Sequence, residues 1–283
     1  MTKIIFVSFA DYRYRKSLER LERQTEGFPF DERYFLTERT ALTKKYWRRL
    51  KPWLYRRGFG FWSWKASIVK EFLGRLDDGD MLFWSDAGLA WNCNERSLKR
   101  FEEYIGMLSY DKDLLVFEQP TIEQEWTKGD VLEALGAYDD EAVCCSLQLW
   151  AGCFLIKKTP RMIAFLDRWI ALNDLSREFI TDKRSTKPNK PRFKEHRHDQ
   201  SIFSVLAKQY PHVVIPWQEV QPKDGDWSKL EGSPVVGRRL KEIDRPKSEV
   251  FKNKLMRPWR SLLHFYFKYI RDYDYRGKYV WEV

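Results

Sequence analysis

One aspartate and one glycine directly follow an apolar run in the segment FWSDAGLAW, Phe83 to Trp91. A carboxylate at the end of a buried strand suits a hard divalent cation, because Mg²⁺ and Mn²⁺ prefer oxygen ligands and often take only one or two carboxylates from the protein. Gly88 lacks a Cβ and would let a ligand or the backbone pass close by. The alternative is structural: Asp86 caps a turn and Gly88 takes a positive φ.

Lys65 is a second candidate, at the end of the segment RGFGFWSWK. If a helix begins near Trp62, Lys65 lies in its first turn and on the apolar stripe that continues with Val69. A lysine there either extends to the surface or points into a cleft, where its charge would meet a phosphate. The aromatic cluster before it either shapes a sugar or base pocket or packs as core.

A third candidate is the cluster HRHDQ at residues 196–200, which stands at the start of an apolar helical stripe. Asp199 is either a helix cap, the usual role of aspartate at a helix N-terminus, or an acid that positions a ligand. The segment KRSTKPNKPRFKEHRH, residues 183–198, is rich in Lys, Arg and Pro, which predicts an exposed loop. Its cations either remain solvated or neutralise a phosphorylated ligand beside His198 and Gln200.

Short apolar strands that alternate with amphipathic helices must position these residues. Apolar runs predict strands at residues 4–9, 32–36, 81–85 and 113–118, and one or two more within 144–158, broken near Gly152. Periodicity and charge predict helices within residues 11–24, 41–55, 62–76, 97–108, 128–138, 162–170 and 199–206, the third of them ended by Gly79. This alternation predicts an α/β fold with a mainly parallel sheet flanked by helices.

The composition narrows the class of protein. The formal net charge of +10 predicts an anionic partner, either nucleotide phosphates, a nucleic acid or an acidic membrane surface. The four cysteines form no CxxC pair, so neither a disulfide framework nor a zinc site is supported. No P-loop, GxSxG or HExxH motif occurs. Without a secretory signal or a long apolar stretch, we expect a cytoplasmic protein, soluble or peripheral at the inner face of the membrane.

The C-terminal segment has its own pattern. In KLMRPWRSLLHFYFKYIRDYDYRGKY the apolar residues Trp259, Leu262, Leu263, Tyr266 and Ile270 recur at helical spacing among many cations. This pattern predicts a basic amphipathic helix, which either lies on an anionic bilayer or packs its aromatic face on the rest of the chain.

Four segments in a fixed order resemble a family of bacterial GT-A-type glycosyltransferases of capsule, lipopolysaccharide and other surface-glycan synthesis. These are RGFGFWSWK, FWSDAG, QLWAGCFLIKK and HRHDQSIFSVL, and the resemblance extends from the first strand to about Leu206. It implies a Rossmann-type catalytic domain at residues 1–215, followed by an extension at residues 216–283. The resemblance is specific because of the order and spacing of the four motifs rather than because of any one of them.

The resemblance also implies roles around the metal. Asp86 matches the first acid of the family's Asp-x-Asp loop, which holds Mn²⁺ or Mg²⁺ against the diphosphate of a nucleotide-sugar. Gly88 stands where the second acid would be, so the second protein ligand of the metal is unassigned.

Two later motifs resemble those of the retaining galactosyltransferases of lipopolysaccharide synthesis. Trp150, Ala151 and Gly152 take the place of an Asn-Ala-Gly strand that lines the sugar pocket. Asp199 and Gln200 take the place of an Asp-Gln pair. Because Trp150 replaces the asparagine, the donor contacts from that strand and the choice between retention and inversion stay open.

We therefore predict a metal-dependent glycosyltransferase that moves a sugar from a nucleotide-diphosphate donor to a glycan or lipid-linked glycan acceptor. Asp199 would lie beside the anomeric carbon, as nucleophile, electrostatic stabiliser or acceptor-positioning group. The predicted donor-binding residues are Ser8, Phe9, Arg57, Trp64, Lys65, Gly88, Ala151, Gly152, His198 and Gln200. The alternatives are a non-catalytic carbohydrate-binding module and a nucleic-acid-binding protein; since no nucleic-acid motif is recognised, we expect no nucleic-acid partner.

Overall fold

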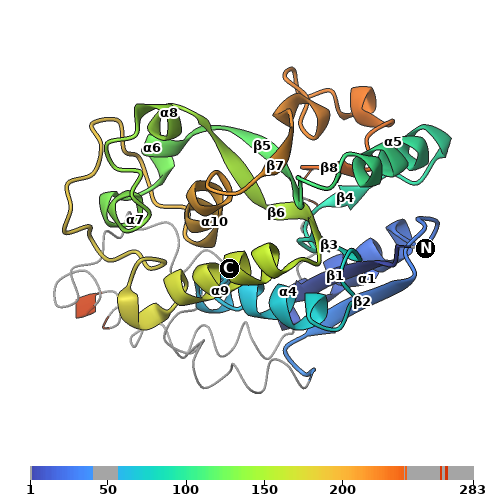
Figure 1. The fold of residues 1–283 in the computed structure, drawn as a ribbon, viewed down its shortest axis with the longest axis horizontal. Helices are drawn as coiled ribbons and strands as arrows, with labels where there is room; N and C mark the ends of the chain where they lie inside the picture. Colours follow the sequence, from blue (N-terminus) through green and yellow to red (C-terminus); the bar gives the residue numbers. More distant parts are fainter. Residues whose placement is uncertain (1, 41–56, 239, 241–261, 263–264, 267–283) are drawn as a thin grey trace.

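The central sheet of the molecule has six strands (Figure 1). The computed structural model describes residues 2–40, 57–238, 240, 262, 265 and 266. In spatial order the strands are β2 (Glu32–Thr37), β1 (Ile4–Ala10), β3 (Met81–Ser85), β6 (Leu147–Lys157), β5 (Leu114–Ile122) and β7 (His212–Ile215). Only β6 is antiparallel to its neighbours, and the other pairs in this sheet are parallel. The predicted α/β class with a mainly parallel sheet is confirmed.

Helices cover both faces of this sheet because the strand side chains alternate between two apolar cores. Ile5 and Val7 of β1 face a core shared with α4, α9 and α10, and Phe6 between them faces a core shared with α1 and α5. The helices are α1 (Arg15–Gln24), α3 (Gly58–Phe61), α4 (Lys65–Leu73), α5 (Glu95–Gly106), α6 (Glu123–Trp126), α7 (Gly129–Ala134), α8 (Glu141–Cys144), α9 (Pro160–Leu172) and α10 (Asp199–Ala207). Short 3-10 turns occupy Tyr12–Tyr14, Leu175–Arg177, Trp217–Glu219 and Trp227–Leu230.

The structure corrects two predicted boundaries. The helix predicted from Trp62 to a stop at Gly79 begins at Lys65 and ends at Leu73, because the backbone before it is left-handed and Gly74 already caps its end. The strand predicted to break near Gly152 is continuous, since β3 and β5 pair with β6 on its two sides. An unbroken β6 runs through the candidate motif and carries it directly beside the end of β3.

The chain after residue 215 packs on the part before it. β8 (Val235–Val236) pairs antiparallel with β4 (Ala90–Trp91), and Val220 joins the core of α1 and α5. The charged segment 41–55 lies outside the described residues, and so does most of the C-terminal stripe, of which Leu262 and Tyr266 are described and exposed. Within the described part of the chain, no helix is both long enough and apolar enough to cross a membrane.

Candidate functional site

A left-handed turn places Lys65 at the start of α4. Residues 58–62 all have positive φ, including Phe59, Phe61 and Trp62, which are not glycines. Each such residue costs about 1–3 kcal/mol and persists only where the surroundings enforce it. Burial of the Phe59 and Phe61 rings, with a hydrogen bond from the Trp64 indole to the carbonyl of Gly58 at 3.1 Å, supplies that enforcement. The chain therefore enters α4 in one fixed direction.

The ammonium of Lys65 lies inside the protein among three oxygens. Its Nζ is 3.1 Å from Asp86 Oδ1 and 2.9 Å from Asp199 Oδ2, and it donates to the carbonyl of Ala151 at 3.1 Å. Only 2% of the side chain is exposed. Burial alone would lower the pKa of Lys65, but Asp199 and Asp86 outweigh it and raise the pKa, so the lysine is charged. Lys65 therefore points inward rather than to the surface, and it contacts two carboxylates and a carbonyl of the protein; a contact with a phosphate stays a prediction.

Asp86 is the outward-facing member of this triad, by which we mean Lys65, Asp86 and Asp199. Its backbone N–H donates to Gly152 of β6 at 2.8 Å, which fixes the loop after β3 on the neighbouring strand. Its Oδ1 accepts a hydrogen bond from the Trp84 indole at 3.0 Å, and 35% of its side chain is exposed. The backbone carbonyl also starts a turn to Leu89. Asp86 thus begins a turn with its backbone and faces Lys65 with its carboxylate.

The docking of α10 on β6 brings Asp199 to the same place. β6 extends beyond β3, whose last pair is Ser85 with Cys153. The Gln200 amide takes up the unpaired strand edge, accepting from Ala151 N at 2.8 Å and donating to the carbonyl of Leu149 at 2.6 Å. Gln200 therefore holds the helix against the strand, and both ends of its amide are engaged by protein.

Asp199 is the first residue of α10 rather than its N-cap. The N-cap position belongs to His198, which makes no capping hydrogen bond through its side chain. Only 6% of the Asp199 side chain is exposed. Burial raises the pKa of Asp199 to about 6, with Lys65 opposing and Asp86 adding to the shift. At neutral pH this buried carboxylate is ionised and paired with Lys65.

His198 is itself in a strained backbone conformation, and its ring contacts the left-handed turn at residues 58–62. Its φ of 56° and ψ of −124° are unusual for a residue with a side chain. Its ring stacks on Phe61 with centroids 4.8 Å apart, and its Nδ1 lies 2.8 Å from the carbonyl of Ile180. Burial lowers its pKa well below the usual value, so the ring is neutral. His198 therefore supports the backbone on either side of the triad and brings no charge to a phosphate.

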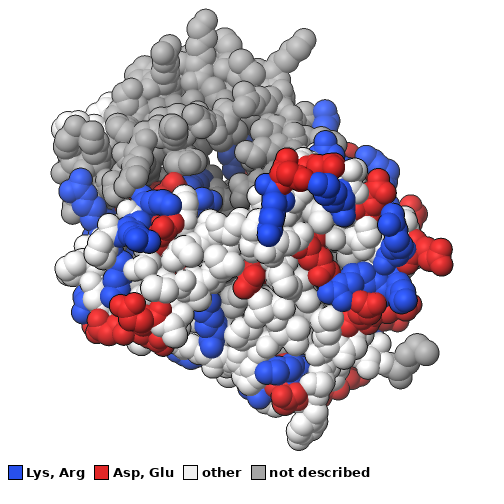
Figure 2. Space-filling model, turned by 90° about the horizontal axis from the view of Figure 1, so that it is seen from above, with Lys and Arg blue, Asp and Glu red and all other residues white. Residues whose placement is uncertain are grey.

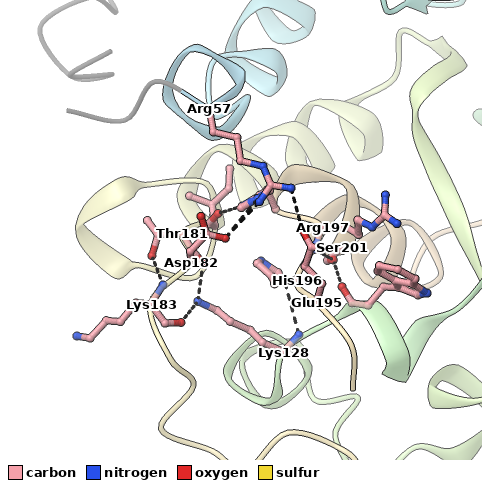
Figure 3. A network of polar contacts seen from close by, with 12 residues as sticks. Arg57, Lys128, Thr181, Asp182, Lys183, Glu195, His196, Arg197 and Ser201 are labelled. Carbon is pink, nitrogen blue, oxygen red and sulfur yellow. Dashed lines mark hydrogen bonds and ion pairs between the residues drawn. The ribbon is translucent and has the colours of Figure 1, made fainter. Parts of the chain in front are cut away.

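The cations of Lys128 and Arg57 hold the segment that leads into α10 (Figure 3). The Lys128 ammonium donates to the carbonyls of Glu178 at 2.6 Å and Thr181 at 3.2 Å, and burial lowers its pKa to about 8. Arg57 pairs with Asp182 at 3.5 Å and Glu195 at 2.9 Å. These contacts tie residues 181–195 to α7 and to the turn before α4.

The predicted basic loop at residues 183–198 has no helix, and Lys183, Lys187 and Lys194 within it pair with acidic residues. Lys187 pairs with Glu133 at 3.1 Å and Lys194 with Glu125 at 2.7 Å. Figure 2 shows one face of the molecule, on which Lys and Arg lie beside Asp and Glu around a largely uncharged middle. In the sequence, the surplus of Lys and Arg falls in residues 41–56 and 239–283, outside the described main body. The described residues therefore carry no surplus of positive charge.

The other predicted donor-binding residues lie deeper. Phe9 packs on Trp64 with ring centroids 4.2 Å apart, and both are buried in the core of α4. Ser8 is fully buried, and its hydroxyl has no hydrogen-bond partner among the described residues. Sequence reasoning missed Trp84, which orients Asp86. The available signal was spacing, because residues two apart on a strand point to the same face.

Two polar groups approach the backbone of Gly152 closely. A Cβ built on Gly152 would lie 2.6 Å from the Trp150 indole nitrogen and 3.2 Å from Asp86 Oδ2. The Trp150 N–H donates no hydrogen bond within the described part of the chain. In contrast, a Cβ on Gly88 would meet nothing within 4 Å, and its φ is not positive. The structure therefore requires glycine at position 152 but not at position 88.

These two glycines give a matched test. We expect Gly152→Ala to displace the Trp150 indole and the loop of Asp86. This change should lower the affinity for the predicted nucleotide-sugar donor and the temperature midpoint of unfolding. Gly88→Ala should keep the midpoint within about 1 °C, since its methyl group enters open space. Thermal unfolding of both variants, followed by titration with nucleotide-sugars, checks this. Equal midpoints for the two variants would contradict the close approach over Gly152.

The residues around Asp86 do not fit a tightly held divalent cation. Within the described residues, no group of three His, Cys, Asp or Glu side chains could hold a metal. The Lys65 ammonium is 3.1 Å from Oδ1 and 3.4 Å from Oδ2 of Asp86, and it would repel a second cation bound there. The neighbouring indoles of Trp84 and Trp150 present N–H donors, which are not metal ligands.

Comparisons with known proteins give structural similarity only. No family model and no curated protein matches the sequence. The apo-form glycosyltransferase GlyE of Streptococcus pneumoniae TIGR4 is similar with TM-score 0.48 and 14% identity, covering 98% of this chain and 66% of that one. A glycosyltransferase involved in glycosylation of the PBCV-1 major capsid has TM-score 0.43 and 11% identity, covering 83% and 93%. The galactosyltransferase LgtC, solved with donor and acceptor sugar analogs, has TM-score 0.38 and 13% identity, covering 82% and 86%. Similarity at this level does not establish an activity.

Proposed function

We propose that this protein is a glycosyltransferase that moves a sugar from a nucleotide-diphosphate donor to a glycan or lipid-linked glycan acceptor. The observation that carries the proposal is the triad, in which segments far apart in sequence place two carboxylates and one ammonium beyond the end of β3. Ligands of open α/β sheets bind at such carboxyl ends. The triad also joins three of the four motifs that resemble bacterial GT-A-type enzymes.

The two acids of the triad differ in exposure: Asp86 is the outer acid and Asp199 the inner one. Asp86 is exposed enough to accept hydrogen bonds from ligand hydroxyls, whereas Asp199 is nearly enclosed. The sugar ring gains positive charge in the transition state of glycosyl transfer, as in glycoside hydrolysis. A fixed carboxylate in a low-dielectric surrounding stabilises such charge without moving. We therefore assign Asp86 to ligand contact, Asp199 to electrostatic stabilisation and Lys65 to holding both.

The direct test is ligand-induced stabilisation by nucleotide-sugars. A panel of nucleotide-sugars, each with Mn²⁺ and with EDTA, should include at least one that raises the unfolding midpoint, because a ligand that binds only the folded state stabilises it. The same donor should then be hydrolysed or transferred to a glycan. Glycan affinity by calorimetry without any nucleotide affinity would instead select a carbohydrate-binding module. No shift with any donor would reject the proposal.

The pKa of Asp199 predicts the acid limb of the activity. Protonation removes the inner carboxylate charge, so turnover should fall as the pH drops below about 6. The sign follows from the direction of the shift: a raised pKa means that the proton binds at a higher pH than for an ordinary aspartate. A turnover profile from pH 5 to 8, at saturating donor, checks this. Constant turnover down to pH 5 would contradict the assignment of Asp199.

Surface-polysaccharide synthesis and a peripheral membrane location stay predictions of the resemblance and of the C-terminal pattern. The panel of nucleotide-sugars would identify the donor sugar and the base, and the transfer assay would give the product for the stereochemical outcome. Product analysis by NMR of the anomeric configuration would separate retention from inversion.

A further inference from the structure

The three oxygens around Lys65 Nζ form the donor set of a hard cation. They are one oxygen from each of Asp86 and Asp199 and the carbonyl of Ala151, at 3.1, 2.9 and 3.1 Å. Carboxylate and carbonyl oxygens are the ligands that Mg²⁺, Mn²⁺ and Ca²⁺ take from proteins. They come from β6, from the segment after β3 and from the first residue of α10, so the fold builds a cage of oxygens around one point. The occupant of that point is the end of a lysine side chain.

Lys65 is anchored firmly in this cage. Its helix begins shortly after the left-handed turn, its side chain is buried, and its ammonium lies 5.9 Å from the ring centroid of Trp84. The ammonium donates hydrogen bonds to Asp86 Oδ2 and to the carbonyl of Ala151, and it forms ion pairs with both carboxylates. The lysine therefore cannot reach a ligand without giving up some of these contacts. Its charge therefore acts on the two carboxylates, which in its absence would repel one another.

Resting on the proposed function, we propose that the Lys65 ammonium is a built-in replacement for the divalent cation of this site, so that the protein binds its nucleotide-sugar without a metal ion. The lysine bridges Asp86 and Asp199 as a cation would. The exposed edge of Asp86 is then an acceptor for sugar hydroxyls, since a bare diphosphate would be repelled by it. Trp150 N–H and Asp86 Oδ2 both lie close to Gly152 and offer one donor and one acceptor to a hydroxyl group, which both accepts and donates.

The first experiment uses the unaltered protein. We expect the donor that shifts its unfolding midpoint to do so equally in EDTA and in Mn²⁺, within a factor of about two in Kd. Electron paramagnetic resonance of added Mn²⁺ should show no tight site in the absence of donor. A donor affinity that EDTA abolishes and Mn²⁺ restores would overturn the inference while leaving the glycosyltransferase proposal intact.

The second experiment removes the ammonium and requires no substrate. In Lys65→Ala the cage is left with two carboxylates and a carbonyl around an emptied space, so Mn²⁺ should now bind and raise the unfolding midpoint by about 3 °C or more. The matched control is Lys70→Ala on the same helix, where the lysine is partly exposed and pairs with Asp167. The control should show neither Mn²⁺ binding nor a metal-dependent midpoint.

The outcomes separate the two proposals. Folded Lys65→Ala that binds Mn²⁺ no better than the unaltered protein would overturn the inference, whichever ligand the protein uses. If Lys65→Ala does not fold even with Mn²⁺, the EDTA comparison on the unaltered protein decides. If no donor binds at all, the function proposal fails, and Mn²⁺ binding by Lys65→Ala still tests whether the cage accepts a cation.

Discussion

Asp199→Asn is expected to lower turnover by about two orders of magnitude while the donor still binds. The substitution keeps the size of the side chain and removes its charge. Asp199 lies 2.9 Å from Lys65 and is almost fully buried, so its field is poorly screened by water. The transition state, with positive charge on the sugar ring, loses more stabilisation than the bound donor does. Steady-state kinetics and donor titration on the same preparation measure both quantities.

Asp167→Asn is a suitable control for this variant. Asp167 lies on α9, is more than half exposed and pairs with Lys70, away from the triad. Its turnover should stay within about twofold of the unaltered protein. The acid limb near pH 6 should also disappear in Asp199→Asn and persist in Asp167→Asn. Unchanged turnover in Asp199→Asn would show that Asp199 has no part in the chemistry.

Lys65→Met is expected to reduce the free energy of unfolding by about 3–5 kcal/mol at pH 8. Methionine nearly fills the volume of lysine but leaves the buried carboxylate of Asp199 without its counter-ion. The loss should be smaller at pH 5, because the buried carboxyl group then takes up a proton and is no longer charged. Denaturant unfolding at the two pH values checks both the size and the sign of this dependence.

A double variant separates charge from packing in this result. Lys65→Met combined with Asp199→Asn leaves no unpaired buried charge beside α4, so it should recover part of the stability lost in Lys65→Met at pH 8. The recovery should be absent for Lys65→Met combined with Asp167→Asn. An additive loss in the first double variant would mean that Lys65 stabilises the fold by packing alone.

Much of the fold could be predicted because it follows from local patterns. The apolar runs that become β1 and β3 are short and continuous, as buried parallel strands require, and the stripe of α9 has helical spacing. The prediction failed at the start of α4, where the aromatic stripe continues backwards through Trp62. Periodicity contains no information on φ, and the left-handed turn at residues 58–62 is enforced by burial against other parts of the chain.

The sequence predicted which residues belong to the candidate site, but it did not predict how they are arranged. Lys65, Asp86 and Asp199 were selected because each is a charged residue beside an apolar element. Their meeting at one ammonium depends on the pairing of β3 with β6 and on the docking of α10 through Gln200. These contacts join residues widely separated along the chain, so no local rule reports them.

The sequence by itself determined the α/β class, the order of the elements and the charged residues at their ends, because strand and helix periodicities and end signals are local. Only the tertiary structure decided what those residues do to one another. It enclosed Lys65 between two carboxylates, left one edge of Asp86 exposed and used the Gln200 amide to hold a helix. The physical reason is that burial and distance set the strength of the interactions of a charged group, and both arise from the packing of the whole chain.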